Sequence, residues 1–153
     1  MSLFRKIKTF IFLDNIKKIL FVEAFVFLAW ARILKSMQFS KIAPLLGKHM
    51  DETSFEHKAS DQMILRNVSD AIYITSNYTF WESKCLVKAI AGMKMLQRRK
   101  IESTLYLGTA KDEKGIMIAH AWLRSGALYI TGAEEMRRFT IVGKFAKRLS
   151  DNR

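Results

Sequence analysis

Residues 83–99, with the sequence SKCLVKAIAGMKMLQRR, decide the fold because they place the only cysteine of the chain, Cys85, where a helix begins. Ser83 is a candidate N-cap, which predicts a helix over residues 84–99 with Cys85 in its first turn. The apolar positions that follow the helical period are Leu86, Ala89, Ile90, Met93 and Leu96. In a first turn, free backbone N–H groups and the positive end of the helix dipole favour a thiolate, the nucleophilic form of cysteine.

A histidine on a predicted strand further along the chain completes the chemical signal. His120 stands in the run His120-Ala121-Trp122, within a strand predicted over residues 115–123. A cysteine followed by a histidine on a later strand is an arrangement used by thiol hydrolases and acyltransferases. Because a lone cysteine is often only a small apolar core residue, the pair indicates a catalytic site without establishing one.

Composition limits the class of protein. The chain has 153 residues, of which half are hydrophobic, and this predicts one globular domain over residues 1–153. One cysteine excludes an internal disulfide and a cysteine-based zinc site, and it favours the cytoplasm. The net charge of +12 fits nucleic acid, an anionic membrane surface or an acidic polypeptide as partner. Nucleic acid is not expected, because aromatic residues do not alternate with the scattered basic ones.

Residues 1 to about 37 are predicted to be helical. Residues 1–13 resemble a signal peptide only briefly, because the apolar run stops at Asp14 and no small-residue cleavage site follows. Residues 19–34 are more apolar, but Glu23 and Arg32 interrupt them, and the stretch is shorter than the roughly 20 residues that span a bilayer. We therefore expect a buried helix.

The remaining chain reads as helix followed by strands, an α+β pattern. Residues 48–60, with His49 and His57, are polar and suggest a mobile linker without a metal site. The other predicted elements are a helix over 60–76, strands over 104–108, 115–123 and 127–131, and a short C-terminal helix within 134–148. A helix that carries cysteine at its start and packs on a small antiparallel sheet that carries histidine is the layout of papain-like and transglutaminase-like hydrolases.

Several motifs closely resemble the lasso-peptide biosynthesis B2 proteins, which are leader peptidases of transglutaminase-like fold. The motifs, in chain order, are Glu23-Ala24, Ala31-Arg32, residues 81–89 (WESKCLVKA), 95–99 (MLQRR), 105–108 (LYLG), 119–123 (AHAWL), Ile130-Thr131-Gly132 and Phe139. The resemblance implies a stand-alone cysteine protease, with a helical part and loop over residues 1–60 and a catalytic core over residues 61–150. No cofactor is expected, and no metal, because no Cys/His cluster has the spacing of metal ligands. The resemblance also implies three partners: the precursor peptide, a leader-recognition protein of the B1 or RRE type, and an asparagine-synthetase-like cyclase that closes the macrolactam with ATP.

The third catalytic residue is left open. The family's triad ends in an aspartate on the strand after the histidine, but no aspartate lies between His120 and Asp151. If a turn at Ser125-Gly126 closes a hairpin, His120 lies opposite Thr131. Glu134 is the first candidate for orienting His120. Thr131, Glu135, a backbone carbonyl or a simple Cys–His dyad are the alternatives.

The substrate-binding residues and the activity also have alternatives. Trp81 is a candidate wall of the cleft, whereas Trp122 suits the core better than a substrate contact. The same Cys85 and His120 would serve an acyl transfer to an amine, and a non-enzymatic scaffold that binds the precursor is the other alternative. The apolar helix over residues 19–34 and the positive charge offer a docking surface for a protein partner or, less favoured, a membrane.

Overall fold

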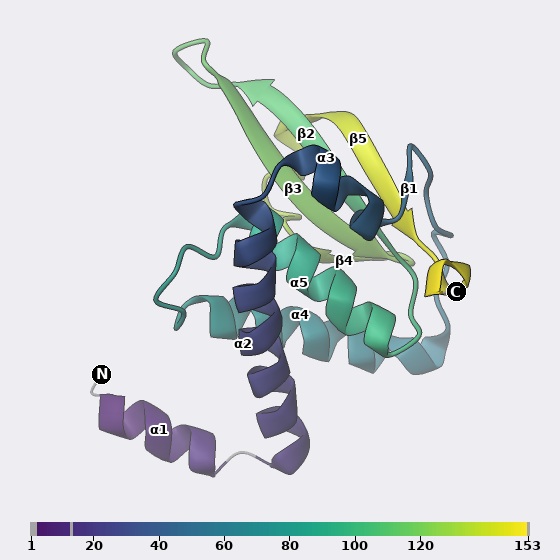
Figure 1. Cartoon of the computed structure of the whole chain (residues 1–153). Coiled ribbons are helices and arrows are strands. Elements are labelled where there is room, and N and C mark those ends of the chain that lie inside the picture. Colours follow the sequence, from purple (N-terminus) through teal and green to yellow (C-terminus); the bar gives the residue numbers. More distant parts are fainter. Residues whose placement is uncertain (1–2, 13, 153) are drawn as a thin grey trace.

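A computed structural model describes residues 3–12 and 14–152, and Figure 1 shows a layer of helices against one twisted antiparallel sheet. The helices are α1 (Leu3–Ile11), α2 (Asn15–Lys35), α3 (Phe39–Ile42), α4 (Gln62–Ser76) and α5 (Cys85–Arg98). The strands are β1 (Lys48–His49), β2 (Ser103–Lys111), β3 (Met117–Ser125), β4 (Leu128–Thr131) and β5 (Thr140–Lys147). Their order in the sheet is β1-β5-β2-β3-β4, and every neighbouring pair is antiparallel. The predicted α+β architecture is therefore confirmed.

The core lies between α2, α4, α5 and one face of the sheet. Alternation along β3 directs Ala121 and Leu123 into this core. Gly92 allows α5 to approach the sheet closely, because a Cβ at that position would lie 2.9 Å from Leu123 Cδ2. Trp122 and Arg124, the alternating residues of β3, are buried as well, but they lie on the other face of the sheet.

An ion pair joins α2 to α5 at the edge of the core. The buried Glu23 carboxylate accepts two hydrogen bonds of 2.7 Å from the Arg99 guanidinium, and Arg98 approaches it to 3.0 Å. Bidentate pairs of this kind fix orientation as well as distance. This ion pair joins residues that lie far apart in the sequence: Glu23 on α2, and Arg98 and Arg99 at the C-terminal end of α5.

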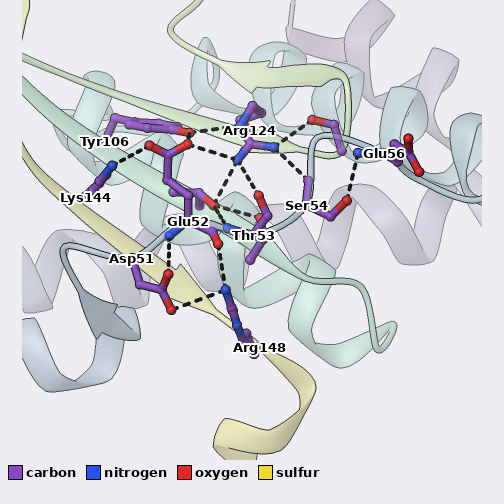
Figure 2. Close-up of polar contacts among 11 residues, drawn as sticks. Asp51, Glu52, Thr53, Ser54, Glu56, Tyr106, Arg124, Lys144 and Arg148 are labelled. Atoms are coloured by element: carbon purple, nitrogen blue, oxygen red, sulfur yellow. Dashed lines mark hydrogen bonds and ion pairs between the residues drawn. The ribbon is translucent and has the colours of Figure 1, made fainter.

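The second face of the sheet is covered by residues 51–57, which pack around Arg124 (Figure 2). The Arg124 guanidinium donates hydrogen bonds to the phenolic oxygen of Tyr106 and to the carbonyl oxygens of Thr53, Ser54 and Gly126, at 2.8–2.9 Å. Nearby, the Glu52 carboxylate accepts a 2.6 Å hydrogen bond from Lys144, which lowers the pKa of Glu52. The prediction of a linker over residues 48–60 holds in that residues 51–58 form no helix or strand. The segment is not purely a solvent loop, however, because Lys48–His49 form β1 and residues 52–54 make these contacts with the sheet.

The N- and C-terminal predictions also need correction. The N-terminal helical region is two helices, because Asp14 interrupts the first and caps α2 by accepting a 2.9 Å hydrogen bond from the Lys17 N–H. The prediction of a C-terminal helix is wrong, since most of residues 134–148 form β5, which lies inside the sheet between β1 and β2. Pairing with β2 outweighs local preference there and buries Phe145 and Ala146. Over residues 3–12 and 14–152, no helix has the length and apolar character needed to cross a membrane.

Candidate active site

Cys85 is the first residue of α5, as the sequence predicts, and its side chain is half-buried. The N-cap, however, is Lys84 and not Ser83, and the Lys84 side chain makes no capping hydrogen bond. The Ser83 hydroxyl instead shares a 2.8 Å hydrogen bond with the Thr79 hydroxyl. The first-turn N–H groups of α5 thus donate no hydrogen bond to an N-cap side chain.

The loop over residues 77–84 holds Cys85 in place. The Thr79 hydroxyl donates to the Trp81 carbonyl at 3.1 Å, and Lys35 at the end of α2 donates to the Glu82 carboxylate at 3.1 Å. The Lys35 ammonium lowers the pKa of Glu82. Trp81 packs edge-on against Phe25 of α2 with ring centroids 5.0 Å apart, and its buried Nε1 has no hydrogen-bond partner. Trp81 is therefore positioned by packing beside the nucleophile's helix.

Helix and strand spacing relates the positions of Cys85 and His120 along β3. Cys85 lies two turns before Gly92 on the same side of α5, about 10 Å along its axis. Gly92 faces Leu123. Since α5 ends where β2 begins and β3 is antiparallel to β2, β3 runs in the direction of α5. About 10 Å corresponds to three strand residues, which leads from Leu123 back to His120. Because three is an odd step, the His120 side chain lies with Trp122 on the face of β3 opposite the one that packs on α5.

The His120 ring is held by a backbone carbonyl. Its Nε2 lies 2.9 Å from the carbonyl oxygen of Gly132, which directly follows β4. Because a carbonyl only accepts, Nε2 carries the proton, and Nδ1 is the basic nitrogen in the neutral ring. The ring also packs on Phe139 and Trp122, with centroids 5.0 and 5.9 Å away. Trp122 is 4% exposed and stacks on Tyr106, so it supports His120 from the interior.

Tyr73 of α4 fixes the Gly132 peptide in turn. The Gly132 N–H donates a 2.9 Å hydrogen bond to the Tyr73 phenol, and that phenol donates a 3.0 Å hydrogen bond to Glu134. Burial raises the pKa of Tyr73, which keeps the phenol protonated and able to donate. Lys88, one turn after Cys85 on α5, places its ammonium 5.1 Å from the centre of the Tyr73 ring. These contacts connect the first turns of α5 to the peptide that holds His120.

Comparison with known proteins identifies the family of this chain. The family model of the transglutaminase-like superfamily matches residues 24–144, which span α2 to the middle of β5. The chain belongs to the transglutaminase-like superfamily. No curated protein and no solved structure matches it. Members of this superfamily are commonly cysteine peptidases or acyltransferases, and the fold described above is compatible with either activity.

In this transglutaminase-like chain, none of the candidate third side chains hydrogen-bonds the His120 ring among the described residues. Thr131 pairs with Leu123, so its predicted position opposite His120 is wrong. The turn residues are 126–127, and a register shift between Leu123 and Arg124 moves the pairing further. The Glu134 carboxylate accepts from Tyr73, Glu135 is exposed, and the Gly132 carbonyl occupies the place beside Nε2.

The transglutaminase-like site is thus assembled from four elements. The structure brings His120, Gly132, Tyr73 and Glu134 into one hydrogen-bonded group, while no hydrogen bond joins Cys85 to His120 among the described residues. In the same part of the chain, no three His, Cys, Asp or Glu side chains cluster as ligands for a metal ion. Sequence reasoning missed Tyr73, which no motif marks. Gly132, in contrast, stands in the Ile130-Thr131-Gly132 motif, and a Cβ there would lie 2.6 Å from the Ala121 carbonyl oxygen.

Proposed function

We propose that this chain is a cysteine peptidase that removes the leader from a lasso-peptide precursor, with Cys85 as nucleophile and His120 as proton acceptor and donor. The observation that carries the proposal is the hydrogen bond from His120 Nε2 to the Gly132 carbonyl. It fixes the ring tautomer in which Nδ1 accepts a proton, which is the state a general base requires. Cys85 lies at the positive end of α5.

In the proposed reaction, His120 Nδ1 takes the proton of the Cys85 thiol as substrate closes the pair, since catalytic contacts tighten in the substrate complex. The thiolate attacks the carbonyl carbon at the junction of leader and core. The Cys85 N–H, with a second donor from the loop over residues 77–84, stabilises the oxyanion, and one such donor contributes about 3 kcal/mol. His120 then protonates the leaving amine of the core. Water hydrolyses the leader–Cys85 thioester, which frees the leader and restores the thiol.

The proposed substrate class and partners come from the resemblance of the motifs around Cys85, His120 and Gly132 to the B2 proteins. A leader-recognition protein would present the precursor, and an asparagine-synthetase-like cyclase would use the freed amine. The basic surface of the chain, with a net charge of +12, suits an acidic peptide or protein partner. In the acyl-transfer alternative, an amine instead of water would attack the same thioester.

The test is cleavage of a precursor peptide in the presence of a leader-recognition protein, followed by mass spectrometry. The wild-type chain should release a free leader and a core with a new N-terminus, whereas the Cys85→Ala, Cys85→Ser and His120→Ala variants should not. His49→Ala is the matched control, because His49 lies on β1 and should leave cleavage unchanged. A new amide on the leader would indicate acyl transfer. Full activity of Cys85→Ala would refute the thiol mechanism.

A further inference from the structure

The N-terminal helix presents an apolar face that nothing in the described chain covers. We define the N-terminal apolar surface as Leu3, Phe4, Ile7, Ile11 and Phe12 together with Ile16 at the start of α2. Leu3, Phe4 and Phe12 are each at least 75% exposed, and the other three are at least half exposed. In Figure 1, α1 projects from the N-terminal end of α2, away from the sheet. Large apolar side chains exposed together on one helix face indicate a binding surface.

Basic side chains border this apolar surface. Helix α1 also carries Arg5, Lys6 and Lys8, and it contains no acidic residue. Lys6 reaches back to the body of the protein, where its ammonium lies 4.6 Å from the centre of the Tyr78 ring. Lys17 and Lys18 follow at the start of α2, where Asp14 is the one acidic residue nearby. The apolar surface is therefore flanked by positive charge along its length.

Exposed apolar residues beside a basic residue also continue along the outer side of α2. A shallow hollow of about 450 Å³ lies there, and Ile19, Val22 and Val26 line it with Lys18. These three apolar residues are each more than half exposed. Exposed apolar residues thus extend from α1 onto α2.

We infer that the N-terminal apolar surface docks on an anionic lipid bilayer. A helix with an apolar face flanked by lysine and arginine lies in the plane of a membrane interface, where the apolar side chains enter the acyl boundary and the basic ones meet phosphate headgroups. Each basic residue near such a surface strengthens binding by about fivefold. Charge complementarity favours anionic over neutral lipid, and no spanning segment is needed for this attachment.

The test uses the full chain with vesicles of phosphatidylcholine, alone or with about one third phosphatidylglycerol, in a co-sedimentation assay. Wild-type protein should bind the anionic vesicles and bind the neutral ones much more weakly, and rising salt should weaken the anionic binding. The double variant Phe4→Glu/Ile7→Glu should bind at least about tenfold more weakly. Arg5→Ala/Lys8→Ala should lose about 25-fold, because each charge contributes about fivefold.

A matched control separates this surface from general stickiness. Met63 on α4 is 73% exposed, so Met63→Glu adds one charge elsewhere and should leave vesicle binding unchanged. Circular dichroism of each variant checks that the fold is retained. Absence of wild-type binding to anionic vesicles, equal binding to neutral ones, or equal losses in Met63→Glu would overturn the inference. So would Phe4-dependent self-association or protein binding without any vesicle binding.

Discussion

Replacing Tyr73 with phenylalanine tests whether the contacts behind His120 matter for catalysis. The change removes one hydroxyl, which accepts a 2.9 Å hydrogen bond from the Gly132 N–H and donates a 3.0 Å hydrogen bond to Glu134. Each such bond contributes about 1 kcal/mol to stability, so we expect a loss of about 1–2 kcal/mol in the free energy of unfolding. The Gly132 peptide also becomes free to rotate, and its carbonyl then holds His120 Nε2 less firmly.

The catalytic loss should exceed the loss of stability. Misplacement of a catalytic group by about 1 Å costs up to about 100-fold, so we expect kcat for leader cleavage to fall by about 10- to 100-fold while the protein stays folded. Nitrogen-15 NMR of His120 should show wild-type protein with the proton on Nε2, and Tyr73→Phe with a mixture of tautomers. Tyr129→Phe, which removes a phenol from neighbouring β4, is the control. An unchanged kcat together with an unchanged tautomer in Tyr73→Phe would refute the positioning role.

Three further changes follow from the ion pairs and from the placement of Glu134. Glu23→Ala leaves the half-buried Arg99 without its partner and should lower the free energy of unfolding by about 2–4 kcal/mol in urea titrations, whereas the exposed Asp70→Ala should change it by less than about 0.5 kcal/mol. Glu134→Gln keeps an acceptor for Tyr73 and should retain cleavage within about threefold; a loss as large as that of His120→Ala would restore Glu134 as the residue that orients His120. Lys144 lowers the pKa of Glu52 in the folded chain, so the contribution of Glu52 to stability is complete above about pH 4.5 and disappears as the pH falls through the folded pKa. Melting temperatures between pH 7 and pH 3 should therefore fall less steeply in Glu52→Gln than in wild type, and parallel curves would contradict this.

The parts of the fold that follow local patterns are predictable from the sequence. The helical period around Leu86 and Met93 places Cys85 at the start of α5, and the apolar β-branched runs locate β2, β3 and β4 to within a few residues. The C-terminal strand is different, because its position inside the sheet depends on pairing with β2. Because Lys144 and Lys147 are charged, the local sequence does not indicate a buried strand, although Phe145 and Ala146 between them are core residues.

The partner of His120 is not predictable for a related reason. A backbone carbonyl is one of the alternatives that the sequence leaves open, and it is the one that the structure shows. No sequence signature, however, identifies the residue that supplies this carbonyl, and the candidate side chains Glu134, Glu135 and Thr131 do not bond the ring. The register of the β3–β4 hairpin decides which residue arrives beside His120, and a shift between Leu123 and Arg124 alters that register. The glycine at position 132 is the local hint, because glycine readily adopts the positive φ of 76° that the backbone has there.

The central claim is that Cys85 forms a thioester with the leader, and intact-mass spectrometry of the acid-quenched reaction tests it most directly. Wild-type chain mixed with precursor and leader-recognition protein should show a transient mass increase equal to the leader, located on Cys85, that decays as free leader accumulates. His120→Ala should not form this adduct at a comparable rate. Leader release without any adduct on Cys85, and at an undiminished rate in Cys85→Ala, would contradict the account.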